Sequence, residues 1–256
     1  MGAAADVPVL IVAEWDDLPG VAHGFFGRRG GVGHGPLGSL NVSAAVGDDP
    51  DVVAENWRRA GARFGGTRWL RMRQVHGDRV ARVSAIDDVP GEADGLITAA
   101  AGAALAVLTA DCVPLLAVAP AAGAIMALHA GWRGTLAGIA IAGLREAQSW
   151  LGIEPSQWRF ALGPAIDGCC YEVESHIGEQ LLRRWGGMAD AWQPAGMHGQ
   201  LDLRAANRRL LVDAGVPDAQ IWTIGPCTAC HSDEFFSHRR SGGRAGRQLS
   251  AIGLTP

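Results

Sequence analysis

The chain has 256 residues, a net charge of −4 at neutral pH and 48% hydrophobic residues, enough for a substantial core. All 22 of its basic residues are arginine, set against 26 acidic residues. This balance argues against a protein that binds nucleic acid through its charge, because such domains carry a clear basic excess. The apolar content likewise excludes a disordered chain.

The N-terminal stretch and the cysteine content favour a cytoplasmic protein. MGAAADVPVLIVAEW has no cationic region ahead of its apolar residues, unlike a secretory signal. Five cysteines, an odd number in a long chain, suit free thiols better than a disulfide framework. From Gly95 to Trp132 the only formal charge is Asp111, but Pro114, Pro120 and Gly123 divide this run into pieces of strand length. We therefore expect no membrane association.

The predicted elements begin with a strand at 7–15, followed by a glycine-rich loop, HGFFGRRGGVGHGPLGSLN, at 23–41. Residues 48–64 open with Asp and Pro and carry Val53, Trp57 and Ala60 on one face, which predicts a capped helix. Segments rich in branched residues then predict the strands of a mixed sheet, at 69–77, 78–86, 95–99, 104–110, 113–119 and 123–130.

The second half of the chain alternates between helices and strands. Apolar spacing predicts a helix at 135–152, a strand and turn at 158–166, helices at 174–185 and 201–215, and a strand at 221–226. No strong linker separates the halves, so we predict a single domain, 1–256, with an α/β (or α+β) sandwich of mixed β-sheets. The loops FFGRRGG at 25–31 and FFSHRRSGG at 235–243 resemble each other, either by chance or because both approach one anionic ligand.

An Asp-Cys pair interrupts the apolar run LAVLTADCVPLLAVA at 105–119. Burying an unpaired carboxylate is costly, so Asp111 and Cys112 need partners, a metal or a cleft. His129 ends the next apolar segment, and His76 lies at a Gly-Asp turn. If these segments are neighbours, His76, Cys112 and His129 form a two-histidine, one-cysteine set with one open position, as in catalytic zinc sites. For each residue taken alone, the spacing favours the ordinary alternative, a core cysteine or a surface histidine.

Other motifs carry weaker signals. CTACH at 227–231 matches a haem-attachment motif and half of a zinc-deaminase signature, but an export signal and the His-x-Glu half are lacking, so we expect neither. No His-x-His pair occurs, which argues against a blue-copper and trinuclear copper site. Arg133, in AGWRGTLAG, lies at a predicted helix N-terminus that is either an anion site or a simple cap. Arg28, in GRRGG, is a second phosphate candidate or a solvated loop arginine.

Nine stretches together resemble the YfiH-like, laccase-domain or polyphenol oxidase family of purine nucleoside phosphorylases. They run from about residue 23 to 247: HGFFGRRGG, SLNVS, QVHGD, EADGLIT, TADCVPLL, HAGWRGT, GPAIDGCCYEV, LDLRAAN and CTACHSDEFFSHRR. The resemblance implies a YfiH-like sandwich of mixed sheets, related to a cytotoxic necrotising factor domain with a Cys-His hydrolase site. It implies that His76, Cys112 and His129 bind Zn²⁺ or Cu²⁺. Gly27 and Gly33 stand where the family usually has Thr and Ser.

The same resemblance implies phosphorolysis of adenosine, inosine and methylthioadenosine to the free base and a (methylthio)ribose 1-phosphate, together with adenosine deamination. Asp111, Cys112 and Arg133 would be catalytic, with Asp111 moving a proton or orienting a ligand. Four residues would bind substrate and phosphate: Arg28, Asn41, Gln74 and Arg133. The alternatives are a metal-free Cys112–His129 amidase that edits cell-wall precursors, a copper-dependent polyphenol oxidase and a non-catalytic binding module. The oligomeric state is not predicted.

Overall fold

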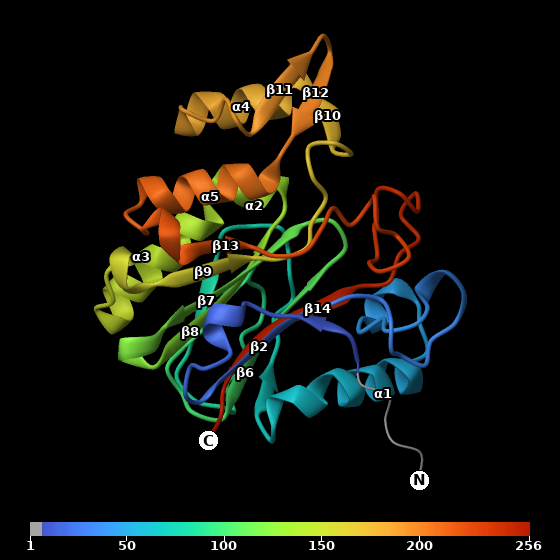
Figure 1. Ribbon diagram of the computed structural model, residues 1–256, viewed down its shortest axis with the longest axis vertical. Helices are drawn as coiled ribbons and strands as arrows, with labels where there is room; N and C mark the ends of the chain where they lie inside the picture. Colours follow the sequence, from blue (N-terminus) through green and yellow to red (C-terminus); the bar gives the residue numbers. More distant parts are fainter. Residues whose placement is uncertain (1–6) are drawn as a thin grey trace.

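Two mixed β-sheets form the centre of the protein, which a computed structural model describes over residues 7–256 (Figure 1). Residues 1–6, part of the predicted domain and of the N-terminal stretch considered above, lie outside this range. The five-stranded sheet has the order β1 (Val9–Leu10), β2 (Val21–Phe26), β14 (Gln248–Leu254), β6 (Ala103–Thr109) and β3 (Arg68–Leu70). The six-stranded sheet has the order β13 (Ile221–Thr223), β9 (Arg159–Leu162), β7 (Val113–Ala119), β8 (Ala124–Ala130), β5 (Gly95–Thr98) and β4 (Val80–Val83).

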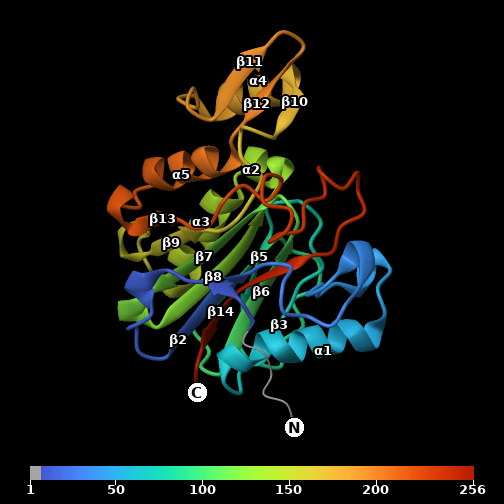
Figure 2. The same cartoon turned by 45° about the vertical axis from the view of Figure 1, so that its right-hand side comes forward.

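Side-chain alternation explains why the two sheets stack. Leu116 of β7 and Ile125 of β8 join Leu105 of β6 and Ile252 of β14 in one buried cluster between the sheets. The outer face of the six-stranded sheet packs on α2 (Trp132–Ala137), α3 (Ile139–Leu151) and α5 (Leu203–Asp213), and that of the five-stranded sheet packs on α1 (Pro50–Gly61). Figure 2 shows α1 apart from the other helices. The predicted α/β sandwich with mixed sheets is confirmed.

Residues 172–201 form a small unit at the top of the view in Figure 1. It contains α4 (Ser175–Trp185) and an antiparallel sheet of order β10 (Glu172–Glu174), β12 (His198–Leu201) and β11 (Trp192–Ala195). Gly178 permits α4 to lie against Trp192, because a Cβ at this glycine would lie 2.0 Å from the indole. Trp192 and Leu181 belong to the apolar cluster on the outer face of the six-stranded sheet, so the unit shares that core.

The observed elements differ from the sequence predictions in several places. The helix predicted at 135–152 is wrong as one element: α2 and α3 are divided at Gly138, whose φ of +95° is left-handed. The strand predicted at 69–77 ends at Leu70. The strand predicted at 7–15 is observed only at Val9–Leu10, and strands β2, β10, β11, β12 and β14 were not predicted. The capped helix at 48–64 is confirmed, and the Asp49 carboxylate accepts from the Asp51 N–H. Among the described residues, no helix combines the length and apolar character needed to cross a membrane.

Candidate metal centre

Strand pairing brings Cys112 beside the end of β8. Val113 pairs with Ala130 and Pro114 with His129 in the antiparallel β7–β8 ladder. Cys112 immediately precedes this ladder. Because side chains alternate between the two faces of a strand, Cys112 and His129 are on the face that lies between the two sheets. His129 is 2% exposed. The thiol and the imidazole therefore lie at one end of the core between the two sheets.

His76 is held by a loop that closes on Asp94. The Asp94 carboxylate accepts from the backbone N–H groups of Val75, His76 and Gly77, at 3.1, 2.9 and 2.7 Å. The same carboxylate lies 2.8 Å from His129 Nδ1 and is fully buried. His76 has a φ of +61°, a strained value that these bonds maintain. Asp94 therefore positions both histidines. Asp94 lies in the EADGLIT stretch, but no role was predicted for it from the sequence.

Three donor atoms, one each from His76, Cys112 and His129, lie within 4.8 Å of one another. A Cβ built on Gly131 would lie 3.0 Å from Cys112 Sγ and 3.1 Å from His76 Nδ1, so this glycine leaves space beside the donors. Two imidazoles and a thiolate suit one Zn²⁺ or Cu²⁺ ion. They are too few for several copper ions, and within residues 7–256 the other cluster of this kind contains only cysteines.

The charges of Cys112 and His129 support each other. Burial raises the pKa of the Cys112 thiol, but the charge of His129 and hydrogen bonds from both histidines outweigh burial and lower this pKa to about 6. Burial lowers the pKa of His129, whereas Cys112 and Asp94 raise it to about 9. Both shifts favour the thiolate–imidazolium form of the pair when no metal is bound. A thiolate is the form needed both for metal binding and for nucleophilic attack.

The Asp111 carboxylate finds its partners in a loop of the C-terminal part of the chain. It accepts from Thr228 Oγ1 and from the Arg239 N–H, both at 2.7 Å, while the Asp111 carbonyl accepts from the Ile166 N–H at 2.9 Å. The φ of Asp111 is +90°, in the left-handed region. These bonds account for the burial of an acidic group next to Cys112. They also tie residues 228–239 to the start of β7.

A cavity of about 430 Å³ lies beside the three donors and is lined by His76, Cys112 and His129 together with Gln74, His238 and Arg247, among others. The backbone N–H of Arg247 donates to Asn41 Oδ1 at 2.8 Å, and its guanidinium Nη1 donates to the Ala245 carbonyl at 2.8 Å. Arg247 was not among the predicted site residues, and His238 was noted only as part of the FFSHRRSGG loop. A larger cavity of about 710 Å³, lined in part by Asp167 and Arg204, contains none of the three donors.

The four residues predicted to bind substrate and phosphate have different surroundings. Gln74 lines the 430 Å³ cavity, and its amide exchanges two hydrogen bonds of 2.8 Å with the Leu108 backbone. Asn41 is buried and bonds to Arg247, as described above. Arg133 is exposed, with its guanidinium 4.4 Å from the Trp132 ring centre. The structure therefore brings one of the four to the cavity and links a second to it.

Arg28 connects two loops. Its Nε donates to the Gly38 carbonyl at 2.9 Å and its Nη1 to the Ser232 carbonyl at 2.7 Å. Its guanidinium also lies over the Phe236 ring. The neighbouring Gly27 permits this approach, since a Cβ there would lie 2.3 Å from the Glu234 carbonyl oxygen. The two loops that share the aromatic-arginine-glycine pattern thus meet in space.

Comparison with known proteins places this geometry in a family. The family model described as multi-copper polyphenol oxidoreductase laccase matches residues 22–255. The chain belongs to this laccase family. The resemblance stated from the sequence motifs is confirmed.

Relatives of this laccase-family chain are similar over most of their length. Purine nucleoside phosphorylase YlmD of Geobacillus stearothermophilus is 40% identical over 248 residues, covering 91% of this chain and 90% of that protein. Purine nucleoside phosphorylase of Deinococcus radiodurans is 41% identical over 240 residues, covering 91% and 89%. The crystal structure of the Geobacillus YlmD matches with a TM-score of 0.89 at 37% identity, over 97% of both chains. That of Bacillus licheniformis hypothetical protein YfiH matches with 0.89 at 33% identity, over 98% and 97%.

Proposed function

We propose that this protein is a purine nucleoside phosphorylase that uses inorganic phosphate to release the base from its sugar. The observation that carries the proposal is the 430 Å³ cavity, which combines the His76, Cys112 and His129 donors with the cationic Arg247. The relatives named purine nucleoside phosphorylase, at 40% and 41% identity, support the same activity.

His76, Cys112 and His129 would hold the metal, and we propose Zn²⁺, because this donor set with an open position is typical of catalytic zinc. When bound, the ion supplies a Lewis acid that polarises an oxygen atom of a reactant. Asp94 fixes the orientation of both imidazoles. Asp111, through its strained backbone and its bonds to Thr228 and Arg239, fixes the direction of the adjacent Cys112.

The remaining groups in the cavity provide for phosphate and base. In phosphorolysis a phosphate oxygen forms a bond to the sugar C1′ as the bond from C1′ to the purine nitrogen breaks. The electron pair leaves with the base, which then takes up a proton. The Arg247 guanidinium holds the phosphate, and Arg28 and Arg133, which do not line this cavity, are further candidates for this role. The His238 imidazole supplies the proton, and the fixed amide of Gln74 orients the nucleoside.

We extend the proposal to adenosine, inosine and methylthioadenosine as substrates and to the deamination of adenosine. In deamination, water attacks the purine C6 and ammonia leaves, so that adenosine becomes inosine. We also propose a cytoplasmic location. Within the described residues all five cysteines are free, which suits a reducing compartment.

The test incubates the purified protein with adenosine, with and without phosphate, and identifies the products by mass spectrometry. Adenine and ribose 1-phosphate formed only with phosphate would support phosphorolysis, and inosine would support deamination. Neither product, with inosine and methylthioadenosine also unchanged, would refute the enzymatic proposal. His129→Ala should abolish turnover, while His198→Ala, a change at an exposed histidine of β12, should not.

The thiolate–imidazolium pair of Cys112 and His129 favours a second candidate, an amidase that acts without metal. A thiol-alkylating reagent applied to chelator-treated protein separates the two. Amide hydrolysis that survives the chelator and is lost on alkylation would support the amidase. Nucleoside turnover lost on chelation and restored by Zn²⁺ would support the phosphorylase.

A further inference from the structure

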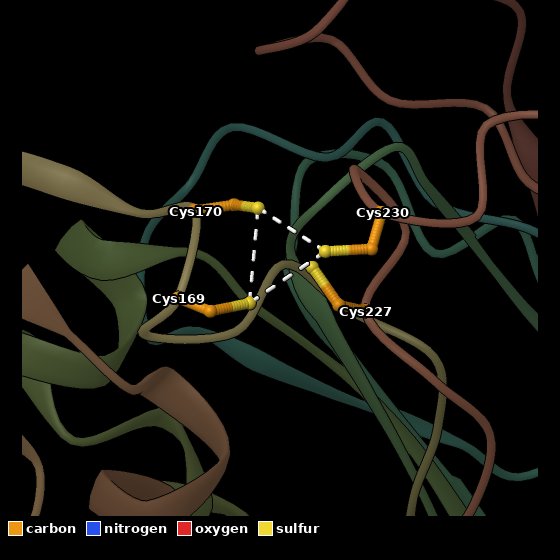
Figure 3. Close-up of side chains that lie close together, drawn as sticks. All are labelled: Cys169, Cys170, Cys227 and Cys230. Carbon is orange, nitrogen blue, oxygen red and sulfur yellow. Dashed lines mark hydrogen bonds between the residues drawn. The ribbon is translucent and has the colours of Figure 1, made fainter.

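Four cysteines form a second cluster, separate from Cys112. Cys169 and Cys170 lie in the loop after β9, and Cys227 and Cys230 lie in the loop after β13. Their sulfur atoms all lie within 4.8 Å of one another. Figure 3 shows the four side chains pointing toward one another from these two loops. The proposed phosphorylase reaction uses none of them.

The sulfur-to-sulfur distances match those around a tetrahedral metal ion. Cys169 Sγ lies 3.7 Å from both Cys170 Sγ and Cys230 Sγ, and the last two lie 3.4 Å apart. Zn–S bonds of about 2.3 Å place neighbouring sulfurs of a tetrahedron about 3.8 Å apart. A disulfide has an S–S bond of about 2.05 Å, and all four cysteines are free. A redox pair would also engage two sulfurs and leave two unexplained, whereas one ion engages all four.

The surroundings of the cluster suit a bound thiolate. The Asp167 N–H donates to Cys227 Sγ at 3.4 Å, a contact that favours negative charge on the sulfur. The Asp167 carboxylate is in turn paired with Arg204, so the backbone that makes this contact is anchored. Four ionised sulfurs at such short distances repel one another unless a cation lies between them.

We propose that Cys169, Cys170, Cys227 and Cys230 together bind one Zn²⁺ ion in a closed structural site. Four protein ligands leave no open position, in contrast to the three-donor set at His76, Cys112 and His129. Binding involves no oxidation: each thiol loses its proton to solvent and forms a bond to the metal. The proposal is independent of the proposed function, since it concerns other residues.

The ion would join the two loops that flank the cavity. Ala165 and Cys227 already form an isolated parallel bridge, and the Thr228 N–H donates to the Ala165 carbonyl at 2.9 Å. Thr228 Oγ1 bonds to Asp111, beside Cys112. The loop from Cys227 then continues to His238, which lines the cavity. Zinc at the cysteine cluster would therefore hold the residues that position Asp111 and His238.

The test uses His129→Ala protein, in which the three-donor set is broken, prepared with reducing agent and freed of metal. Titration with Co²⁺ should give one equivalent bound, with the strong near-ultraviolet charge-transfer absorption of several thiolates and the visible bands of tetrahedral cobalt. Cys230→Ser in the same background should lose most of that absorption. Both Cys169 and Cys230 are exposed, so Cys169→Ser provides a second variant if the first does not fold.

Elemental analysis of wild-type protein should give about one more zinc per chain than the Cys230→Ser variant. Co²⁺ absorption unchanged by either serine substitution would overturn the proposal. So would a failure of the His129→Ala protein to bind metal, or a mass showing disulfides among the four cysteines in protein purified without reductant. Wild-type protein that binds zinc at the four cysteines but not at His76, Cys112 and His129 would count against the proposed function and not against this site.

Discussion

Replacing Asp94 with asparagine tests whether one buried carboxylate positions the metal donors. The carboxylate of Asp94 accepts four hydrogen bonds, from three successive backbone N–H groups and from the His129 imidazole. Asparagine has almost the same shape but only one acceptor oxygen. Its NH₂ group must therefore face two of the four partners, and it cannot accept a hydrogen bond from a backbone N–H.

The expected loss follows from the bonds at each oxygen. Oδ2 receives Val75 and Gly77, and Oδ1 receives His76 and His129. If NH₂ replaces Oδ2, the N–H groups of Val75 and Gly77 lose their buried acceptor. If it replaces Oδ1, the His76 N–H group loses its buried acceptor. At about 1–3 kcal/mol for each unsatisfied group, Asp94→Asn should lower the free energy of unfolding by about 1–6 kcal/mol. Metal affinity should fall roughly 10–100-fold, as for other residues that orient metal-binding histidines.

Urea unfolding of metal-free protein and a Zn²⁺ competition titration measure the two effects. Asp88→Asn is a matched control, because Asp88 also accepts two backbone N–H groups, from Ser84 and Ala85, but in an exposed loop. The control should change stability by less than about 1 kcal/mol. If Asp94→Asn has the stability and the zinc affinity of the wild type, then Asp94 does not position the histidines and our account of the site is wrong.

Three further changes test other parts of the structure. Gly131→Ala should weaken Zn²⁺ binding roughly tenfold or more, because its Cβ would lie 3.0 Å from Cys112 Sγ and overpacking costs about 1–3 kcal/mol. Gly168→Ala should leave Zn²⁺ binding unchanged, because the atom nearest to its Cβ would be 3.6 Å away. Arg247→Gln should raise the phosphate KM roughly tenfold or more through a lost charged hydrogen bond, and a larger rise in Arg28→Gln would contradict this. Burial lowers the pKa of His23 to about 4. Only the unfolded state therefore gains this proton between pH 6.5 and 4, and wild-type stability should fall there by about 3 kcal/mol in urea unfolding. His23→Gln should lose less stability over that interval, and an equal loss would contradict the assignment.

Much of the fold could be predicted because its strands are apolar and short. Strands β7 and β8 are buried on both faces, which explains the continuous apolar runs, separated by Gly, Pro and Asp, from which a mixed sheet was predicted. Strand β14 escaped prediction because its sequence, QLSAIGL, mixes serine, glycine and glutamine with apolar residues, although all seven residues are buried. It lies between β2 and β6, and its backbone pairs with both, so the small and polar side chains do not prevent it from forming a strand. Such a strand is recognised only by its partners.

The site shows the same limit. His76, Cys112 and His129 were found because titratable residues at the ends of apolar segments are conspicuous, and the family resemblance then made them metal ligands. Asp94 and Arg247 were missed because their roles depend on chain segments that approach only in the folded protein. Asp94 reaches back 18 residues to the His76 N–H, and the Arg247 N–H bonds to Asn41, 206 residues away in the chain. Sequence spacing carries no signal for such contacts.

The position of β14 has a consequence for how the protein is made. This strand is the last element of the chain, yet it lies in the middle of the five-stranded sheet, between β2 and β6. During synthesis the sheet cannot close until residues 248–254 have left the ribosome, and until then β2 and β6 present open edges to their surroundings. Nascent chains that stall before Gln248 should therefore depend on chaperones, and loss of the final strand should yield aggregated protein instead of a slightly shorter enzyme.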